Sequence, residues 1–480
     1  MQVQEQVIAE IAREVVARLR VQMQQPQSST ALPTAAAPRD GVFATVDEAV
    51  NAAFEAQKQV AAMSLDRRGK MIDIIRRICM ERREELGRME LEETKVGRLD
   101  HKILKLTNMR FVLGVEAMRS ESHSDSTGLC IVEHAPWGVI GMMLPVTHSV
   151  PTMASNAINI LAAGNTAVFG PHPSGAHVAQ YALQLFNREI ERECGVANVL
   201  TTIGEAGIAA SEQIFNHPKV ALICVTGGTA VARAAAKSGK RVIAGGPGNP
   251  PVVVDETADL DHAAKCIIEG AAFDNNLLCI GEKEVFVVAS VADRFIDAMR
   301  RAGAFQLDSA AIERLTRAAF TFDGSGGGCA KAHVAKKFVG KDVAVLAAAA
   351  GVSAPAGTDL LFGETDENHT FVVEEQMMPF IPIVRVCDVD AAIAAAVRAE
   401  HGYRHTAIMH SQNIESVTRM ARALNTTIFV HNAASPASLG VGGPGYFSHT
   451  IATPTGEGIT TPLTFTRQRQ IVVGNALRII

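Results

Sequence analysis

Short apolar segments that end at glycine, proline or a polar turn alternate with helical segments in the first half of the chain, and this alternation limits the fold more than any other feature. The apolar segments are Pro136–Pro145, Asn165–Gly170, Val220–Val225 and Arg241–Ala244, and helical patterns lie between them at 151–163, 174–187 and 230–238. Strands that are joined by helices form a mostly parallel sheet with helices on its faces. The sequence therefore predicts an α/β protein.

Length and composition exclude several classes of protein. The chain has 480 residues, more than the roughly 100–200 that one domain usually holds, so two or three domains are expected. Its net charge of −5 indicates no basic surface for nucleic acid, and no apolar run approaches the ~20 residues that span a membrane. The eight cysteines form no CxxC pair and the 15 histidines form no HExxH motif, so we expect neither disulfides nor a metal site. A reducing cytoplasm is the simplest compartment.

The first forty residues differ from the rest of the chain. Residues 1–20 carry apolar side chains at helical spacing, and residues 21–40 are rich in Gln, Pro, Ser, Thr and Ala. A short amphipathic helix on a flexible linker is marginally stable alone and needs a surface to cover its apolar side. We expect it to dock into a groove of a partner protein. Folding back onto its own chain is the alternative, and the mixed charge of its polar face disfavours a membrane surface.

Cys279 is the strongest candidate for a nucleophile. It follows the polar segment Phe273–Asn276 and precedes the apolar strand Glu284–Val288, so it would be exposed on one side and held rigidly on the other. The thiolate is the reactive form of cysteine. The alternative is that Cys279 is a small core residue, as most free cysteines are. Cys329, beside the glycine-rich segment 324–328, is a weaker candidate.

A glycine pair marks a candidate ligand site. Thr226-Gly227-Gly228-Thr229 follows the strand Val220–Val225, at the point where a helix begins. Ligands of parallel sheets bind at the carboxyl ends of the strands, and glycines let the backbone approach a phosphate at a helix N-terminus. The segment is not a GxGxxG motif, and an ordinary turn remains the alternative.

Five motifs, in this order, resemble the aldehyde dehydrogenase superfamily and within it the CoA-acylating branch. They are Pro136–Gly141, Ala163–Thr166 with Pro171–Pro173, Gly245–Pro251, Asn275–Cys279 and Glu375–Pro379. The resemblance extends from about residue 45 to residue 475. In addition, the tethered helix at 1–20 is similar to the encapsulation peptides of bacterial microcompartment enzymes.

The resemblance implies a Rossmann-like cofactor domain, an α/β catalytic domain and a β arm for oligomerisation. The expected boundaries are an encapsulation helix at 1–20, a linker at 21–40, an NAD-binding domain at 41–250 with an arm strand near 126–135, a catalytic domain at 251–435, and a return segment with the arm at 436–480. Apolar and polar residues alternate in Leu463–Thr466, Gln470–Val473 is mostly apolar, and these two segments would pair with Leu129–Val132 in the arm. Because an exposed strand needs a partner edge, we expect a homodimer or homotetramer.

The resemblance also assigns roles to individual residues. Cys279 would be the nucleophile, and its backbone N–H would stabilise the oxyanion, with Thr147 as the candidate second donor. The residues implied in NAD binding are Thr226, Gly227, Gly228, Thr229, His172, Pro173 and Glu375, the last of these on the nicotinamide ribose. For the basic segment Lys331–Lys337 we favour a solvated helix face over a site for coenzyme A phosphates.

One departure from the family pattern bears on the reaction. Hydrolytic members carry a glutamate that activates water in the motif that here reads Gly245–Gly248, which contains no acid. Without a base, water attacks a thioester slowly, and the thiol of CoA can compete. We therefore expect the conversion of a short-chain aldehyde, most of all propionaldehyde, with NAD and CoA to acyl-CoA and NADH, in the lumen of a microcompartment whose shell or core proteins bind residues 1–20. A hydrolytic enzyme that releases the free acid and a shell-binding scaffold without catalysis are the alternatives.

Overall fold

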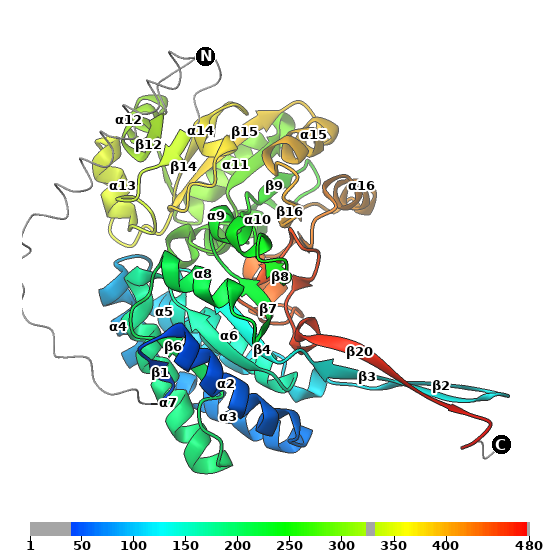
Figure 1. Cartoon of the computed structure of the whole chain (residues 1–480). Helices are drawn as coiled ribbons and strands as arrows, with labels where there is room; N and C mark the ends of the chain where they lie inside the picture. The colour runs from blue at the N-terminus through cyan, green and yellow to red at the C-terminus, as the bar shows by residue number, and fades with distance from the viewer. Residues whose placement is uncertain (1–39, 323–331, 478–480) are drawn as a thin grey trace, which may run out of the picture. The chain divides into compact units, whose positions relative to one another are not determined.

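The computed structural model describes residues 40–322 and 332–477, and these contain two parallel sheets and an antiparallel arm (Figure 1). The predicted helix at 1–20 lies outside the described residues, as do Cys329, Lys331 and all but the last residue of the predicted linker. Within the described part, no helix combines the length and the apolar character that crossing a membrane requires.

The first sheet has six parallel strands in the order β1-β6-β5-β4-β7-β8. They are β1 (Val42–Phe43), β6 (Leu200–Ile203), β5 (Thr166–Gly170), β4 (Val139–Met143), β7 (Val220–Val225) and β8 (Arg241–Ala244). The chain moves outward from β4 through β5 to β6, and then returns to the other side of β4 with β7. The strand order thus reverses between β4 and β7, and such a reversal opens a crevice at the carboxyl ends of the strands.

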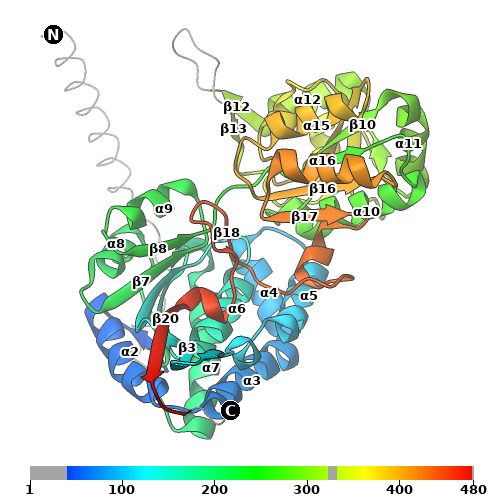
Figure 2. The same ribbon diagram turned by 90° about the vertical axis from the view of Figure 1, so that its right-hand side faces the viewer.

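The second sheet has seven parallel strands in the order β11-β14-β15-β10-β9-β16-β17. They are β11 (Phe305–Gln306), β14 (Leu361–Thr365), β15 (Phe380–Val386), β10 (Glu284–Val288), β9 (Pro251–Val254), β16 (Thr406–His410) and β17 (Ile428–His431). Every residue of β10 is buried, as expected for the centre of a covered parallel sheet. Figure 2 shows this sheet, marked by β10, β16 and β17, in a separate part of the body from β7 and β8.

Helices cover both sheets. They are α2 (Val46–Ala61), α3 (Leu65–Glu81), α4 (Arg83–Thr94), α5 (Leu99–Thr107), α6 (Ser149–Ala162), α7 (Ala176–Cys194), α8 (Ile208–Asn216), α9 (Thr229–Ala236), α10 (Leu260–Ala272), α11 (Ala289–Arg301), α12 (Ser309–Ala319), α13 (Val343–Ala350), α14 (Thr370–Val373), α15 (Val389–Ala399) and α16 (Ile414–Leu424). Helix α2 begins at a capping box formed by Thr45 and Glu48. All residues of α6 are buried, and α6 packs against α3, α5 and α7. The segment just before α6, which contains Thr147, is therefore fixed to the core.

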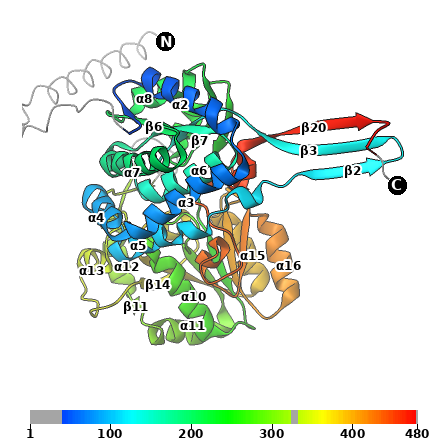
Figure 3. The same cartoon turned by 90° about the horizontal axis from the view of Figure 1, so that it is seen from below.

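The arm consists of β2 (Glu121–Asp125), β3 (Gly128–Pro136) and β20 (Thr466–Gly474), and it extends away from the sheets (Figure 3). Strand β20 pairs antiparallel with β3 along its whole length, with Ile471 opposite Ile131. Ile471 and Val472 remain exposed, 48% and 71%. Two short hairpins, β12 (Phe320–Phe322) with β13 (Ala332–Val334) and β18 (Ile451–Ala452) with β19 (Gly458–Ile459), complete the strands of the described residues.

The predicted α/β fold with two sheets and an arm is confirmed, and two local predictions were wrong. The strand expected at Leu463–Thr466 is largely a 3₁₀ turn, Pro462–Phe465, which a Thr461 cap and a proline start. The described part of Lys331–Lys337 begins as strand β13 and continues into a turn, so it is not a helix face.

Candidate active site

Cys279 lies on a tightly constrained loop between α10 and β10. The three residues Asp274, Asn275 and Asn276 all have left-handed backbone angles, with φ of 50°, 56° and 63°. Each such residue costs about 1 kcal/mol, least for Asn and Asp. A run of three is therefore held by its surroundings, and Cys279 is partly exposed at the end of it.

The side chains of this loop provide that support. Asn275 Nδ2 donates to the carbonyl of Gly340 at 3.0 Å and to the carboxylate of Asp342 at 2.8 Å. Asn276 Nδ2 donates to the carbonyls of Ala271 and Glu282, both at 2.9 Å. The amide of Asn276 thus bridges the two ends of the turn and that of Asn275 ties the turn to residues 340–342, and together they fix the direction in which Cys279 leaves it.

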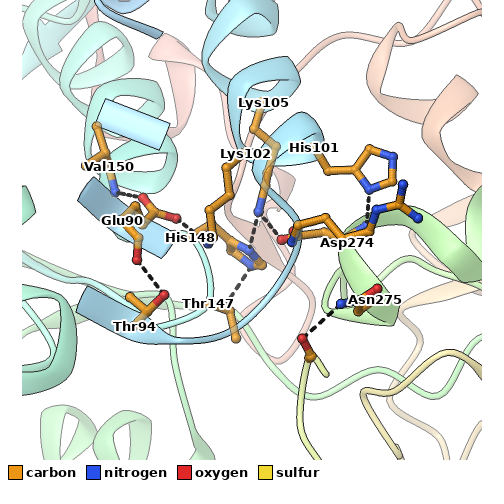
Figure 4. A network of polar contacts seen from close by, with 12 residues as sticks. Glu90, Thr94, His101, Lys102, Lys105, Thr147, His148, Val150, Asp274 and Asn275 are labelled. Atoms are coloured by element: carbon orange, nitrogen blue, oxygen red, sulfur yellow. Dashed lines mark hydrogen bonds and ion pairs between the residues drawn. The ribbon is translucent and has the colours of Figure 1, made fainter. Parts of the chain in front are cut away.

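Asp274 fixes the same loop to the first half of the chain. Its buried carboxylate accepts the N–H of Arg98 at 2.8 Å and an ammonium hydrogen bond from Lys105, and its own N–H donates to Nδ1 of His101 at 2.8 Å (Figure 4). The pKa of Asp274 is lowered, since the charges of Lys105 and Lys102 outweigh the opposing effect of burial. The carboxylate is therefore charged and bonded where the loop begins.

Charged groups around Cys279 control its thiol. Burial, and then the carboxylate of Glu375, raise the pKa of Cys279 to about 12, while Lys283 opposes them. Lys283 is itself buried and donates to the carbonyl oxygens of Asn276 at 3.0 Å and Leu278 at 3.2 Å. Burial raises the pKa of Glu375, which also accepts the N–H of Gly248. In the free protein the thiol is thus protonated at neutral pH, and added positive charge would favour the thiolate.

The glycine motif 245–251 packs directly on the Cys279 loop. A Cβ placed on Gly248 would lie 2.7 Å from the carbonyl oxygen of Cys279 and 3.0 Å from Cγ of His405. Glycine is therefore required here by a close approach of backbone to backbone. A side chain at position 248 would collide with the backbone of Cys279, so this position supplies neither an acid nor a base.

His405 was not predicted from the sequence, although it is buried beside this loop. Burial, and then Lys283, lower its pKa to about 4, so the ring is neutral. Nδ1 lies 2.9 Å from Oγ1 of Thr406, and Nε2 has no protein partner among the described residues. His405 lies in a polar segment just before a strand, where no spacing of apolar residues marks it as buried. Only the fold brings it to Gly248 and Cys279.

Apart from Glu375, which lies between α14 and β15, the predicted cofactor residues lie at the carboxyl ends of β5 and β7, the two strands that flank β4. Thr226–Thr229 follows β7, where Gly228 is the N-cap of α9, and His172 with Pro173 follows β5. A Cβ added to Gly227 or Gly228 would meet no atom within 4 Å, so a phosphate-bearing cofactor could approach this backbone. Lys336 lies near enough to His172 to help burial lower its pKa.

Thr147 lies four residues after the end of β4, the strand beside which the strand order reverses, and it is partly exposed. Its Oγ1 lies 3.0 Å from Nε2 of His148, a buried residue that the sequence analysis did not single out. In the described residues, no group of three or more His, Cys, Asp or Glu side chains could hold a metal ion. The site therefore consists of a cysteine, a candidate hydroxyl donor and buried charges.

Glu282 gives the site a pH dependence that can be measured as stability. Its buried carboxylate accepts the N–H and the Oγ–H of Ser435 at 2.9 and 2.8 Å, and burial raises its pKa to about 7 from 4.5. The folded protein therefore binds this proton more tightly than the unfolded chain, so this carboxyl lowers stability as pH rises from 4.5 to 7. We expect Glu282→Gln, whose amide oxygen still accepts the N–H of Ser435 and whose NH2 group donates to Oγ instead of accepting from it, to stabilise the protein by up to about 3 kcal/mol at pH 8 and hardly at all at pH 4.5. Thermal unfolding of both proteins at the two pH values measures this, and an equal difference at both would contradict it.

Comparison with known proteins shows the family to which the chain belongs. Residues 20–310 match the model described as "Aldehyde dehydrogenase family". An acetaldehyde dehydrogenase (acetylating), EutE, of Salmonella typhimurium is 43% identical over 443 residues, which cover 92% of this chain and 94% of the relative.

Solved structures give the same result. A propionaldehyde dehydrogenase from the fucose utilisation microcompartment of Clostridium phytofermentans has a TM-score of 0.88 and 40% identity, over 92% of this chain and 100% of that one. The propionaldehyde dehydrogenase of Rhodopseudomonas palustris, solved with bound CoA and an acylated cysteine, has a TM-score of 0.89 and 40% identity over the same shares. An engineered glycolyl-CoA reductase with bound NADP+ has a TM-score of 0.89 and 39% identity, over 93% of this chain and 100% of that one. The chain therefore belongs to the aldehyde dehydrogenase family, among its CoA-acylating enzymes.

Proposed function

We propose that this enzyme oxidises an aldehyde of two or three carbons with NAD and passes the acyl group from Cys279 to CoA. The observation that carries the proposal is that the motif Gly245–Gly248 packs on the Cys279 loop through Gly248, while none of its four residues has a side chain that could activate water. A thioester on Cys279 then persists until a thiol arrives. Thioester exchange conserves the energy of the bond, whereas hydrolysis would lose it.

We assign the steps of this reaction to residues as follows. The thiolate of Cys279 attacks the aldehyde carbon, and the N–H of Cys279 with the hydroxyl of Thr147 stabilises the oxyanion. NAD accepts the hydride, which leaves a thioester on Cys279. Lys283 favours the thiolate and Glu375 opposes it, so binding that neutralises Glu375 would activate the nucleophile. The thiol of CoA then attacks the thioester carbon, releases acyl-CoA and restores Cys279.

Cofactor and substrate choice are the finer parts of the proposal. We assign Thr226–Thr229 to the pyrophosphate, His172 and Pro173 to the adenosine side, and Glu375 to the nicotinamide ribose. We place NAD before NADP and propionaldehyde before acetaldehyde. The relatives include an acetaldehyde and a propionaldehyde dehydrogenase at nearly equal identity, so both aldehydes belong in the test.

We expect the purified enzyme to form NADH continuously only when CoA is present. With an aldehyde and NAD alone, a single burst of NADH should accompany acylation of Cys279 and then stop. Spectrophotometry with each aldehyde and each dinucleotide, and chromatography of the product, measure this. Equal steady rates with and without CoA, with free acid as product, would refute the acylating reaction in favour of the hydrolytic one.

We further propose that the enzyme works inside a bacterial microcompartment. Residues 1–20 would target it there by binding a shell or core protein. The support is the apolar spacing of that segment and the linker that follows it. Deletion of residues 1–20 should leave kcat unchanged and abolish co-localisation with shell proteins. The comparison is fluorescence of tagged full-length and truncated enzymes in cells that make the shell. Loss of turnover with intact co-localisation would contradict the assignment of this segment.

A further inference from the structure

We propose that Lys105 and His148 are positioning residues that make the hydroxyl of Thr147 a hydrogen-bond donor to the oxyanion on Cys279. The proposal rests on the function proposed above. It extends that function to two buried side chains from α5 and from the turn before α6, which together with Asp274 connect Thr147 to the Cys279 loop (Figure 4).

The direction of the hydrogen bonds follows from the chemistry of the groups. An ammonium group has three donors and no acceptor, so Lys105 Nζ, which lies 3.4 Å from His148 Nδ1, must donate to that nitrogen. A neutral imidazole that accepts at Nδ1 carries its proton on Nε2. Nε2 of His148 therefore donates to Oγ1 of Thr147 at 3.0 Å. Because Oγ1 of Thr147 uses a lone pair to accept this bond, its own hydroxyl proton is free to point at another acceptor. Donation to the oxyanion requires this.

Burial restricts His148 to this arrangement. The side chains of Lys105 and His148 are almost fully covered, so water does not compete for either ring nitrogen. Burial and the charge of Lys105 also hold the pKa of His148 well below its usual value, which keeps the ring neutral. The ring stacks on that of His449 at a centroid distance of 5.5 Å, which limits its rotation.

Lys105 also connects the two halves of the site. The same ammonium that donates to His148 donates to Asp274, at the start of the left-handed turn that leads to Cys279. One cation thus fixes both the loop that carries the nucleophile and the ring that orients Thr147. A lysine that served stability alone would need only the carboxylate.

A second buried ion pair on the same helix provides the matched control. Lys102, three residues before Lys105 and equally buried, pairs with Glu90 at 2.9 Å. The other oxygen of Glu90 accepts the N–H of Val150 at 2.9 Å, in the first turn of α6. Among the described residues, this pair makes no hydrogen bond to His148 or Thr147 (Figure 4), although the charge of Lys102 helps to lower the pKa values of His148 and Asp274.

The test is a double-mutant cycle on the NADH burst, measured before CoA is added. We expect Thr147→Val to slow the burst about 100-fold, as loss of one oxyanion donor does, with little change in KM for the aldehyde. His148→Phe should slow it about tenfold in the wild-type background and have no further effect on Thr147→Val. Lys105→Met should slow it at least as much, and in the Thr147→Val background it should keep only the part of its effect that acts through Asp274. Thr147→Ser, which keeps the hydroxyl, should retain most of the rate.

Lys102→Met separates positioning from stability. It should lower the unfolding temperature about as much as Lys105→Met does, yet slow the burst far less, because it breaks no hydrogen bond to His148 or Asp274. The proposal is overturned if His148→Phe slows the burst equally in both backgrounds, or if Lys102→Met slows it as much as Lys105→Met. Since the burst precedes acyl transfer, a wild-type enzyme that proves independent of CoA would refute the proposed function while leaving this cycle interpretable.

Discussion

Replacement of Cys279 by alanine is expected to lower kcat at least about 10⁴-fold, because no other group on the loop can form the thioester. Alanine fills nearly the same space, and the loop is held by Asp274, Asn275 and Asn276 rather than by the cysteine. The fold and CoA binding should therefore survive. Mass spectrometry of the enzyme after incubation with propionaldehyde and NAD should find an acyl group on wild-type Cys279 and none on the variant.

Cys266 provides the control for this experiment. Its sulfur lies 3.4 Å from Nε2 of His262, so it has the nearby imidazole that often activates a nucleophilic cysteine. Burial, with the charges of Glu269 and Glu282, nevertheless raises its pKa to about 11, and it belongs to α10 rather than to the loop. Cys266→Ala should keep full activity. An acyl group on Cys266, or substantial turnover by Cys279→Ala, would contradict the choice of nucleophile.

The parts of the fold that the sequence predicted are those with strong local signals. Strands β4, β5, β7 and β8 are short apolar runs between turn residues, and each was expected within a few residues of its observed bounds. Strand β6 (Leu200–Ile203) and α8 (Ile208–Asn216) were not predicted. Both are short, and two threonines in β6 conceal its burial, since their hydroxyls bond to backbone carbonyls of neighbouring elements.

The buried charges of the site could not be predicted from local pattern. Lys102 and Lys105 lie in a segment that reads as an ordinary amphipathic helix, where lysine normally indicates a solvated face. The partner of Lys105 is Asp274, 169 residues away, so only the packed fold shows that the pair is shielded from water. Asp274 itself lies in the polar segment Phe273–Asn276 before Cys279, but its sequence gives no sign of the left-handed backbone.

Replacement of Asp274 by alanine is expected to destabilise the protein by about 3–5 kcal/mol, since it leaves the ammonium of Lys105 buried without its counter-ion. The substitution also removes the acceptor for the N–H of Arg98 and places alanine at a φ of 50°. Thermal unfolding should begin at a clearly lower temperature. The NADH burst should slow as well, because the turn that presents Cys279 is no longer fixed.

Two further variants show whether the unpaired charge is the cause. Asp359→Ala removes a carboxylate that pairs with Arg98, but the pair is largely exposed, so the loss should be at most about 1 kcal/mol. Lys105→Met in the Asp274→Ala background removes the uncompensated charge and should recover part of the lost stability, because an apolar side chain is tolerated where a lone cation is not. The burst rate should stay low in this double variant, since neither the turn nor His148 regains its partner. If the double variant were less stable than Asp274→Ala, the ammonium of Lys105 would have other acceptors in Asp274→Ala. The effect of Asp274→Ala would then come from the lost bond to the N–H of Arg98 and from the left-handed backbone, not from an unpaired charge.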